Sequence, residues 1–227
     1  MKYFVTLHFN SMRATPHRLW FETNNTKTAS YSIMDNLHTM TEQVTSPEKL
    51  ERIGVFCSSS GRMEQVYYDE ARRLGLWLGS HGKTLVYGGS RCGMMEVLAK
   101  AVKESGGKVF GVVPQKVLKN HMVSDQIDIT FYADGLSDRK DWLIGESDIM
   151  VVLPGSVGTL DEAFSAMASH TFGEHQKNII FYNVNGFWDD LFVMLDNLEK
   201  KGVVNKPFNQ FVLRASSLEE LTAMIEG

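Results

Sequence analysis

The sequence predicts an α/β fold with three layers in a Rossmann-like arrangement, in which a mostly parallel sheet carries helices on both faces. Two observations predict this fold. From about Arg52 onward, short apolar runs rich in β-branched residues alternate with longer segments of helical periodicity, which is typical of strand–helix–strand units. The strand-like runs are apolar throughout, as expected for strands of a parallel sheet that is buried on both faces.

The alternation predicts a definite series of elements. Gly82 ends the first helix, and a glycine pair at 106–107 ends the second. Ser217 and Glu220 resemble a capping box at the start of the last helix. The predicted strands are Ile53–Cys57, Thr84–Gly89, Lys108–Pro114, Ile127–Ala133, Asp148–Gly155, Asn178–Val184 and Phe211–Ala215. The predicted helices are Met63–Ser80, Met94–Ser105, Ser137–Glu146, Thr159–Phe172, Phe187–Lys200 and Ser217–Glu226.

The first 50 residues differ from the rest of the 227-residue chain. They are rich in Thr, Asn, Ser and Met, and no period of a strand or helix is sustained. We predict an N-terminal extension over 1–50, with a strand at Lys2–Phe9 and either an irregular arm or a helix around Ser32–Gln43 after it. Residues 51–227 form the predicted Rossmann-like domain, which is long enough to bury a sizeable core.

Composition and charge narrow the function classes. The net charge of −4 and the pI of about 6.0 argue against a general nucleic-acid binder, which needs a basic surface to neutralise phosphates. No apolar run is long enough to span a bilayer, and the N-terminus lacks the features of a signal peptide. Cys57 and Cys92 lie far apart, which favours a reduced protein. We therefore expect a cytoplasmic protein that binds a small molecule, not nucleic acid or a membrane.

Three turns that follow predicted strands are rich in glycine and serine: 57–61, 87–95 and 153–162. Right-handed crossovers put such turns at one edge of the sheet, where ligands of open α/β sheets bind. Glycines let backbone N–H groups approach a phosphate, and a helix start adds partial positive charge. Tight strand–helix packing explains each turn by itself equally well. The candidate binding residues in these turns are Ser58, Gly88, Gly89, Ser90, Met95, Gly155, Ser156, Val157, Gly158 and Thr159.

Three charged residues near these turns are further candidates for the functional site. Glu162 lies three residues past Thr159, which predicts a position in the first turn of its helix, on the side of the loop. Arg139 and Lys140 lie at the start of another predicted helix, where the helix dipole disfavours cations. A solvated basic pair is the plainer interpretation of these two residues, and a ligand-binding pair is the alternative.

Other conspicuous residues receive structural interpretations. His170 and His175 have no second set of ligands at metal spacing, so we predict no metal site. Cys57 and Cys92 have no obvious activating histidine and are interpreted as small buried residues. Trp142 is interpreted as packing its helix.

The segments GGSRCGMM, DRK and PGSVGTLDE, in this order and spacing, resemble those of the LOG (Lonely Guy) family. The PGGxGTxxE motif of that family is matched at 154–162, its Arg-Lys pair at Arg139 and Lys140, and its early CxSS turn at 57–60. The resemblance covers roughly residue 53 to the C-terminus. The family's GxHxKP stretch is kept in part, as Gly173, His175 and Lys177.

This resemblance implies a homodimer that hydrolyses nucleoside 5′-monophosphates, AMP or N6-substituted AMP of the cytokinin type, to free base and ribose 5-phosphate without a cofactor. It makes Arg139 and Glu162 the catalytic pair, with Lys140 supporting the charge of the ligand and the phosphate on the Gly155–Thr159 loop. N-glycosidic cleavage passes through an oxocarbenium-like transition state. We expect Glu162 to stabilise that charge and to activate the attacking water.

The chain also departs from the family pattern. The departures leave the preferred base open, and they lie at Glu96, His121, Ser156, Val157 and Ala168.

Two other functions remain open. The first is a carrier or sensor that binds a phosphorylated ligand without cleaving it, like the molybdenum-cofactor carrier proteins that resemble this fold. The retained Glu162 favours the enzyme, because a simple anion binder has no use for a carboxylate beside the phosphate. The second is an interaction protein that binds no nucleotide. A lysine decarboxylase is rejected, because nothing marks the Schiff-base lysine that pyridoxal phosphate requires.

Overall fold

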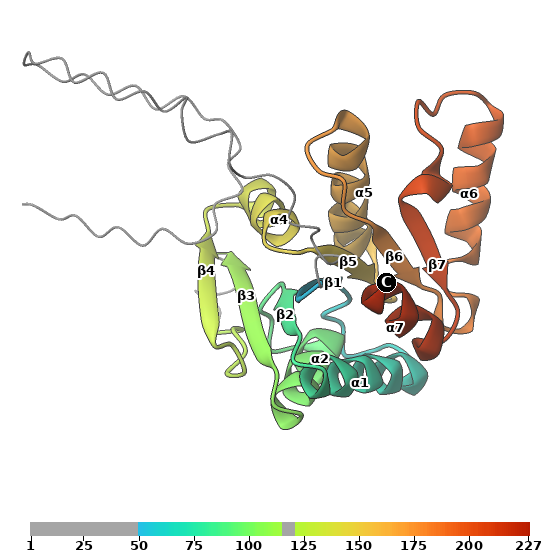
Figure 1. Ribbon diagram of the computed structural model, residues 1–227. Coiled ribbons are helices and arrows are strands. Elements are labelled where there is room, and N and C mark those ends of the chain that lie inside the picture. Colours follow the sequence, from blue (N-terminus) through green and yellow to red (C-terminus); the bar gives the residue numbers. More distant parts are fainter. Residues whose placement is uncertain (1–49, 115–120) are drawn as a thin grey trace, which may run out of the picture. The chain divides into compact units, whose positions relative to one another are not determined.

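The computed structural model describes residues 50–114 and 121–227, and the predictions for the N-terminal extension lie outside these residues. All strands of the described chain form one parallel sheet of seven strands (Figure 1). The strands are β1 Arg52–Phe56, β2 Thr84–Tyr87, β3 Lys108–Pro114, β4 Ile129–Ala133, β5 Ile149–Val152, β6 Ile179–Tyr182 and β7 Val212–Ala215. Their order in the sheet is β4-β3-β2-β1-β5-β6-β7.

Helices cover both faces of this sheet, so the predicted three-layer Rossmann-like fold is confirmed (Figure 1). One face packs against α1 Gln65–Ser80, α2 Gly93–Glu104 and α7 Leu218–Glu226. The other face packs against α4 Leu136–Gly145, α5 Val157–Phe172 and α6 Asp189–Lys200. Two short 3₁₀ turns, η2 Val184–Gly186 and η3 Phe208–Gln210, lie beside α6.

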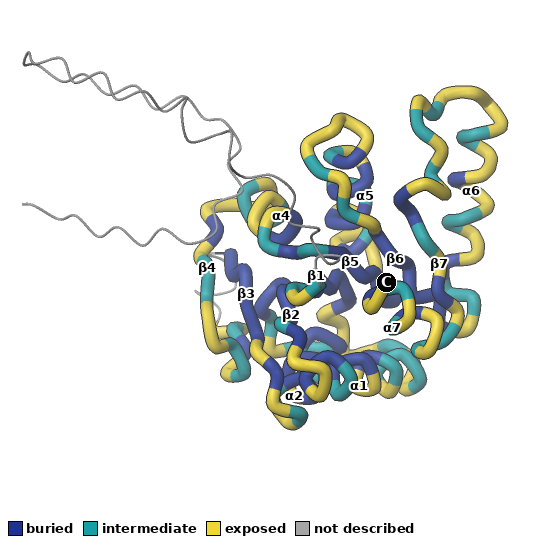
Figure 2. Tube along the Cα trace, in the orientation of Figure 1, coloured by how far each residue is buried: buried dark blue, intermediate teal, exposed yellow. Residues whose placement is uncertain are grey.

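Each inner strand supplies side chains to both layers of core. Successive residues of a strand point to opposite faces, so Val55 joins the cluster under α1 and α2 while Phe56 joins the one under α5. β5 and β6 are buried along their whole length, and β1, β2 and β3 are buried after their first residue, as their continuous apolar runs predict, whereas the edge strand β4 is largely exposed or half-buried (Figure 2). Among the described residues, no helix combines the length and apolar character needed to cross a membrane.

Three helices begin two residues away from their predicted starts, the first of them α1, which begins at Gln65 instead of Met63. α5 begins at Val157, two residues before the predicted start, because Val157 and Gly158 already have helical backbone. α6 begins at Asp189 instead of Phe187, since the 3₁₀ turn and the left-handed Asn185 (φ 51°) come first. Periodicity does not reveal the last two boundaries, because both depend on the backbone of polar or glycine-containing turns.

A capping box starts α7, as predicted. The Oγ atom of Ser217 accepts a hydrogen bond from the N–H of Glu220 (3.2 Å), and Glu220 Oε2 accepts one from the N–H of Ser216 (2.7 Å). The first contact satisfies an N–H group that the helix itself leaves without an acceptor, and the second binds the N–H of Ser216, which precedes the N-cap residue.

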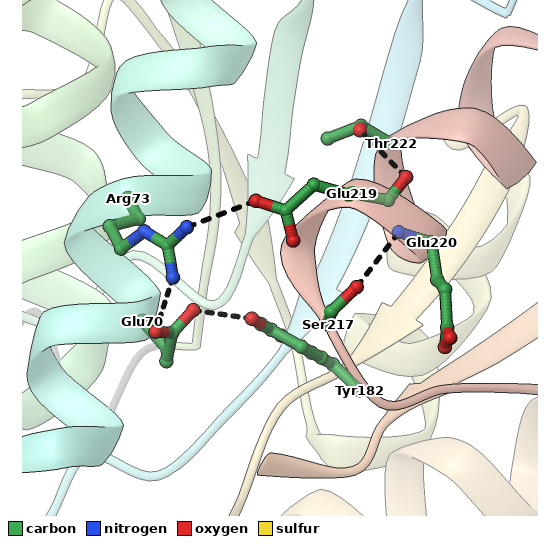
Figure 3. A network of polar contacts seen from close by, with 7 residues as sticks. All are labelled: Glu70, Arg73, Tyr182, Ser217, Glu219, Glu220 and Thr222. Atoms are coloured by element: carbon green, nitrogen blue, oxygen red, sulfur yellow. Dashed lines mark hydrogen bonds and ion pairs between the residues drawn. The ribbon is translucent and has the colours of Figure 1, made fainter.

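A polar network joins α1 to β6 and α7 (Figure 3). Tyr182, which is buried at the end of β6, donates a short hydrogen bond to Glu70 Oε2. Glu70 Oε1 contacts Arg73 Nη1 at 2.7 Å, and Arg73 Nη2 reaches Glu219 Oε1 at 3.3 Å. Burial and the neighbouring Glu70 raise the pKa of the Tyr182 phenol, so it remains a donor at neutral pH.

We expect Tyr182→Phe to lower the free energy of unfolding by about 1.5–3 kcal/mol, because a hydrogen bond to a charged group is lost and Glu70 keeps its desolvation cost. Urea unfolding at neutral pH measures the change. Glu219→Gln is the control, since its ion pair with Arg73 is largely exposed and should leave stability unchanged. Equal stability of Tyr182→Phe and the wild-type protein would contradict this assignment.

Candidate active site

The candidate site lies at the carboxyl edge of the sheet, where α4 and α5 both begin. Arg139 projects from α4 and Glu162 from α5, and their side chains form an ion pair with Nη1 and Oε1 2.6 Å apart. The side chains are only 13% and 6% exposed, respectively. The structure thus brings together the two residues that the sequence resemblance pairs.

The position of Arg139 depends on the ends of two neighbouring strands. Its Nε donates a hydrogen bond to the carbonyl of Val112 in β3 (3.4 Å). Its guanidinium covers Gly88, directly after β2, so closely that a Cβ there would lie 1.9 Å from Nη2. Met95 also approaches Gly88, with its Cε 3.3 Å from that Cβ position. Position 88 thus requires glycine, because any side chain there would displace the Arg139 guanidinium.

Burial and charge oppose each other at Glu162. Burial raises the pKa of its carboxyl above the usual value, and the adjacent Arg139 guanidinium limits this rise. A carboxylate in this state is a stronger base than one in water. The Arg139 contact uses Oε1, and no hydrogen bond to Oε2 occurs within the described part of the chain.

Cys57 lies directly after β1, where the charges of Glu162 and Arg139 act on its thiol. Burial raises the pKa of its thiol, and the negative charge of Glu162 adds to the rise. Cys57 is therefore a protonated, buried thiol at neutral pH, in agreement with its interpretation as a packing residue.

Lys140 forms a second contact between the same two helices. Its Nζ lies 2.8 Å from Asp161 Oδ1. The solvated basic pair that was the plainer interpretation of Arg139 and Lys140 is therefore wrong, because both cations face carboxylates of α5. Sequence reasoning missed the role of Asp161, although its position beside Glu162 was a usable signal.

The turn before α5 has the glycine and polar residues expected of an anion-binding loop. Gly155 packs so closely on Thr159 that a Cβ would lie 2.1 Å from the threonine Oγ1. Val157 and Gly158 lie at the exposed start of the helix, with Val157 81% exposed. Ser156 is the N-cap residue, and its side chain makes no capping hydrogen bond.

These positions correct two predictions. Thr159 does not begin the helix: it is buried in the first turn, because α5 starts at Val157. Glu162 accordingly lies in the second turn instead of the first, two residues further into the helix than predicted. This depth explains its burial.

Ser58 holds the turn after β1 in place. It is largely buried, its N–H donates to the carbonyl of Pro154 (3.3 Å), and its own carbonyl accepts from Met94 (3.1 Å). The Oγ atom accepts a hydrogen bond from the N–H of Ser60 (3.0 Å). Ser58 thus ties the first turn to the other two candidate turns through its backbone.

The turn after β2 contacts residues 122–124, a segment that was not among the predicted binding turns. Gly89 has a left-handed backbone (φ 73°), and its carbonyl accepts from the N–H of Ser124 (3.0 Å). Ser90 forms an isolated antiparallel bridge with Val123. Residues 122–124 therefore border the turn at 89–91, and no motif marks them.

The remaining conspicuous residues have structural contacts. His170 and His175 take part in hydrogen bonds to backbone groups near the end of α5. Trp142 packs at 4.7 Å against the ring of Phe131, as its packing interpretation predicts. Within residues 50–114 and 121–227, no group of His, Cys, Asp and Glu side chains is arranged to hold a metal ion.

Comparison with known proteins shows the family of this chain. Residues 95–225 match the family described as "Possible lysine decarboxylase". A probable cytokinin riboside 5′-monophosphate phosphoribohydrolase of Oryza sativa subsp. japonica is 32% identical over 178 residues, covering 78% of this chain and 72% of the relative. The chain belongs to the LOG family. An Arabidopsis thaliana cytokinin riboside 5′-monophosphate phosphoribohydrolase is 30% identical, covering 78% of this LOG-family chain and 84% of that enzyme.

Solved structures of similar fold include proteins with a different role. The molybdenum cofactor binding protein of the phototrophic bacterium Rippkaea orientalis superposes with a TM-score of 0.61 at 26% identity, covering 78% of this chain and 96% of that chain. The molybdenum cofactor carrier protein of Chlamydomonas reinhardtii gives a TM-score of 0.60 at 23% identity, with the same coverage. The fold is therefore shared by LOG-family relatives and by cofactor carriers.

We expect Arg139→Met to destabilise the protein by about 3–5 kcal/mol at neutral pH, because it leaves Glu162 buried without its partner. Since the folded-state pKa of Glu162 is raised, folding favours its protonated form, and stability falls as the pH rises through that pKa. The substitution raises this pKa further, so stability falls more steeply with pH. Urea unfolding at about pH 5 and about pH 8 measures this difference.

Lys140→Met is the matched control for Arg139→Met. Its partner Asp161 is half exposed, so we expect a loss below about 1 kcal/mol. Similar losses in the two variants would show that the Arg139 contact has no special energetic weight.

Proposed function

We propose that this protein hydrolyses the N-glycosidic bond of nucleoside 5′-monophosphates, AMP or N6-substituted AMP, to free base and ribose 5-phosphate. The observation that carries the proposal is the buried Arg139–Glu162 pair beside the start of α5. The names of the LOG-family relatives support the same reaction.

The loop before α5 supports binding of the phosphate. The first N–H groups of a helix lack intrahelical acceptors and carry the positive end of the helix dipole, which suits an anion. Gly155, Ser156 and Gly158 leave this end of α5 accessible, and the exposed Ser156 hydroxyl adds a donor. Lys140, one turn into α4, contributes a positive charge on the same side as Arg139.

Glu162 supplies the reaction chemistry in this proposal. As the bond between C1′ and the base nitrogen breaks, positive charge develops on the ribose ring, and a nearby carboxylate stabilises it. Glu162 takes a proton from the attacking water, whose oxygen bonds to C1′. The base leaves with the electron pair of the broken bond and takes up a proton at that nitrogen, which balances the proton that Glu162 gains. The raised pKa of Glu162 favours this role as a base. Arg139 holds Oε1, which orients the carboxylate.

A second candidate function is non-catalytic binding of a phosphorylated ligand. The observation that favours it is the structural likeness to molybdenum cofactor carriers. The two functions differ in what Glu162 does, since a carrier has no reaction for it to catalyse. A homodimer, which the family resemblance implies, stays a prediction, as does the cytoplasmic location.

We expect Glu162→Gln to reduce release of base from AMP by at least about 10²-fold, because the substitution removes both the base and the negative charge. Base release is followed by chromatography over a panel of nucleoside 5′-monophosphates, and AMP binding by calorimetry. Asp190→Asn, which changes an exposed carboxylate in the first turn of α6, is the control and should stay near wild-type activity.

Either of two results would count against the hydrolase. Wild-type rates from Glu162→Gln would remove Glu162 from the reaction. Saturable AMP binding by the wild-type protein, with no base released from any nucleotide of the panel, would favour the carrier function.

We expect Gly88→Ala to reduce kcat on the order of 10²-fold while the protein stays folded. The new Cβ overlaps the end of the flexible Arg139 side chain, which has to move away from Glu162. Gly61→Ala is the control, because a Cβ on Gly61 meets no atom within 4 Å. Circular dichroism checks folding, and steady-state kinetics measure kcat. Unchanged kinetics in Gly88→Ala would mean that the position of Arg139 does not limit the reaction.

A further inference from the structure

Lys177 links the two helices that carry the candidate catalytic pair. It lies between α5 and β6, and its Nζ donates hydrogen bonds to the carbonyl oxygens of Ile144 (2.7 Å) and Gly145 (3.0 Å). These carbonyls end α4, and the last turn of a helix leaves its acceptors without intrahelical partners. A cation at this end also interacts favourably with the helix dipole. A residue that follows α5 thereby fixes the end of α4.

Two histidine rings hold the backbone of Lys177. Nδ1 of His175 accepts a hydrogen bond from the N–H of Lys177 (3.2 Å), and its Nε2 donates to the carbonyl of Ala166 in α5 (3.0 Å). Nδ1 of His170 donates to the carbonyl of Lys177 (3.1 Å). Because a carbonyl oxygen only accepts, these contacts assign a proton to Nε2 of His175 and to Nδ1 of His170. Burial lowers the pKa of both rings, which favours their neutral forms.

Lys206 completes this cluster from the other side. Its Nζ donates to Nε2 of His170 (2.7 Å) and lies 5.5 Å from the centre of the Phe211 ring, on which His170 stacks. Within the described chain, the contacts of Lys206 do not include α4. Lys206 therefore belongs to the same cluster but lacks the contact with α4 that Lys177 makes.

The contacts between α4 and α5 form two groups along the helices. Both helices begin at the carboxyl edge of the parallel sheet and run back toward its other edge. Near that carboxyl edge lie the pairs Arg139–Glu162 and Lys140–Asp161. Near the opposite edge lies the contact from Lys177 to the end of α4. The far ends of the two helices are thus joined through a residue anchored to α5.

We propose that Lys177 is a positioning residue, which holds α4 against α5 so that Arg139 meets Glu162. This inference rests on the proposed hydrolysis for its kinetic consequence, but its geometric consequence is independent of it. The hydrogen bonds of Lys177 to α4 are with the carbonyls of Ile144 and Gly145, and it acts on Arg139 through them. Misplacement of about 1 Å at a reacting pair is enough to cost on the order of 10²-fold in rate.

The pKa of Glu162 reports this geometry directly. The charged groups that face Glu162 are Arg139 and Lys140 from α4 and the neighbouring Asp161, and Cys57 faces it as a thiol. Arg139 opposes the rise in pKa that burial causes. When α4 moves away, this opposition weakens while burial remains, so the pKa of Glu162 rises. A variant that merely unfolds a fraction of the molecules does not change the pKa in the folded ones.

The test compares wild-type protein with Lys177→Met, Lys177→Arg and Lys206→Met. Carboxyl ¹³C NMR titration gives the pKa of Glu162, with Glu162→Gln used to assign its signal, and base release from AMP gives kcat and KM. In Lys177→Met we expect the pKa of Glu162 to rise, because Arg139 opposes the effect of burial less strongly, and kcat to fall on the order of 10–100-fold with little change in KM. Lys177→Arg, which keeps the charge and the donors, restores much of both. Lys206→Met leaves both near wild type.

The two readouts separate the inference from the proposed function. An unchanged Glu162 pKa in folded Lys177→Met overturns the positioning role, as does an equal shift in Lys206→Met. If Lys177→Met does not fold, Lys177→Gln replaces it, because the shorter neutral amide cannot hold both carbonyls, and the same pKa criterion applies. If wild-type protein releases no base, the proposed hydrolysis fails, and the pKa of Glu162 by itself decides whether Lys177 positions the pair.

Discussion

The buried ion pair between Arg139 and Glu162 imposes the strictest constraint on this structure. Charges that are removed from water are costly unless they are paired in good geometry, and loss of one partner costs about 3–5 kcal/mol. The two residues belong to helices that pack on different strands: α4 contacts β3 and β4, whereas α5 contacts β1 and β6. The pair thus depends on the whole parallel sheet for its placement, and the contacts of Lys140 and Lys177 hold the same two helices together.

The ion pair also depends on two backbone features around Arg139, a glycine and a carbonyl group. Gly88 lets the Arg139 guanidinium lie on the end of β2, and the Val112 carbonyl gives it an acceptor.

Ser156 stands where the family motif has a second glycine. Its φ of −108° is open to any residue, so this departure needs no strained backbone and adds a hydroxyl beside the start of α5.

A second departure from the family pattern, Glu96, places a buried polar group near the site. Glu96 stands where the family resemblance expects glycine, and its Oε2 is buried without a hydrogen-bond partner in the described chain, as is the hydroxyl of Tyr87. Burial raises the pKa of the Tyr87 phenol, and the charge of Glu96 adds to the rise. The end of β2 and the first turn of α2 therefore carry buried polar groups beside the turn that holds Gly88.

The sequence alone determined the strand–helix alternation, the three glycine-rich turns and, through the motif resemblance, the identity of Arg139 and Glu162, because these depend on local periodicity and on residue types at fixed spacing. Only the tertiary structure decided the sheet order, the true start of α5, the pairing of Lys140 with Asp161 and the contact of Lys177 with α4. Those features join residues far apart along the chain. Their energies arise from burial and from charges brought together by the fold, which no local pattern in the sequence records.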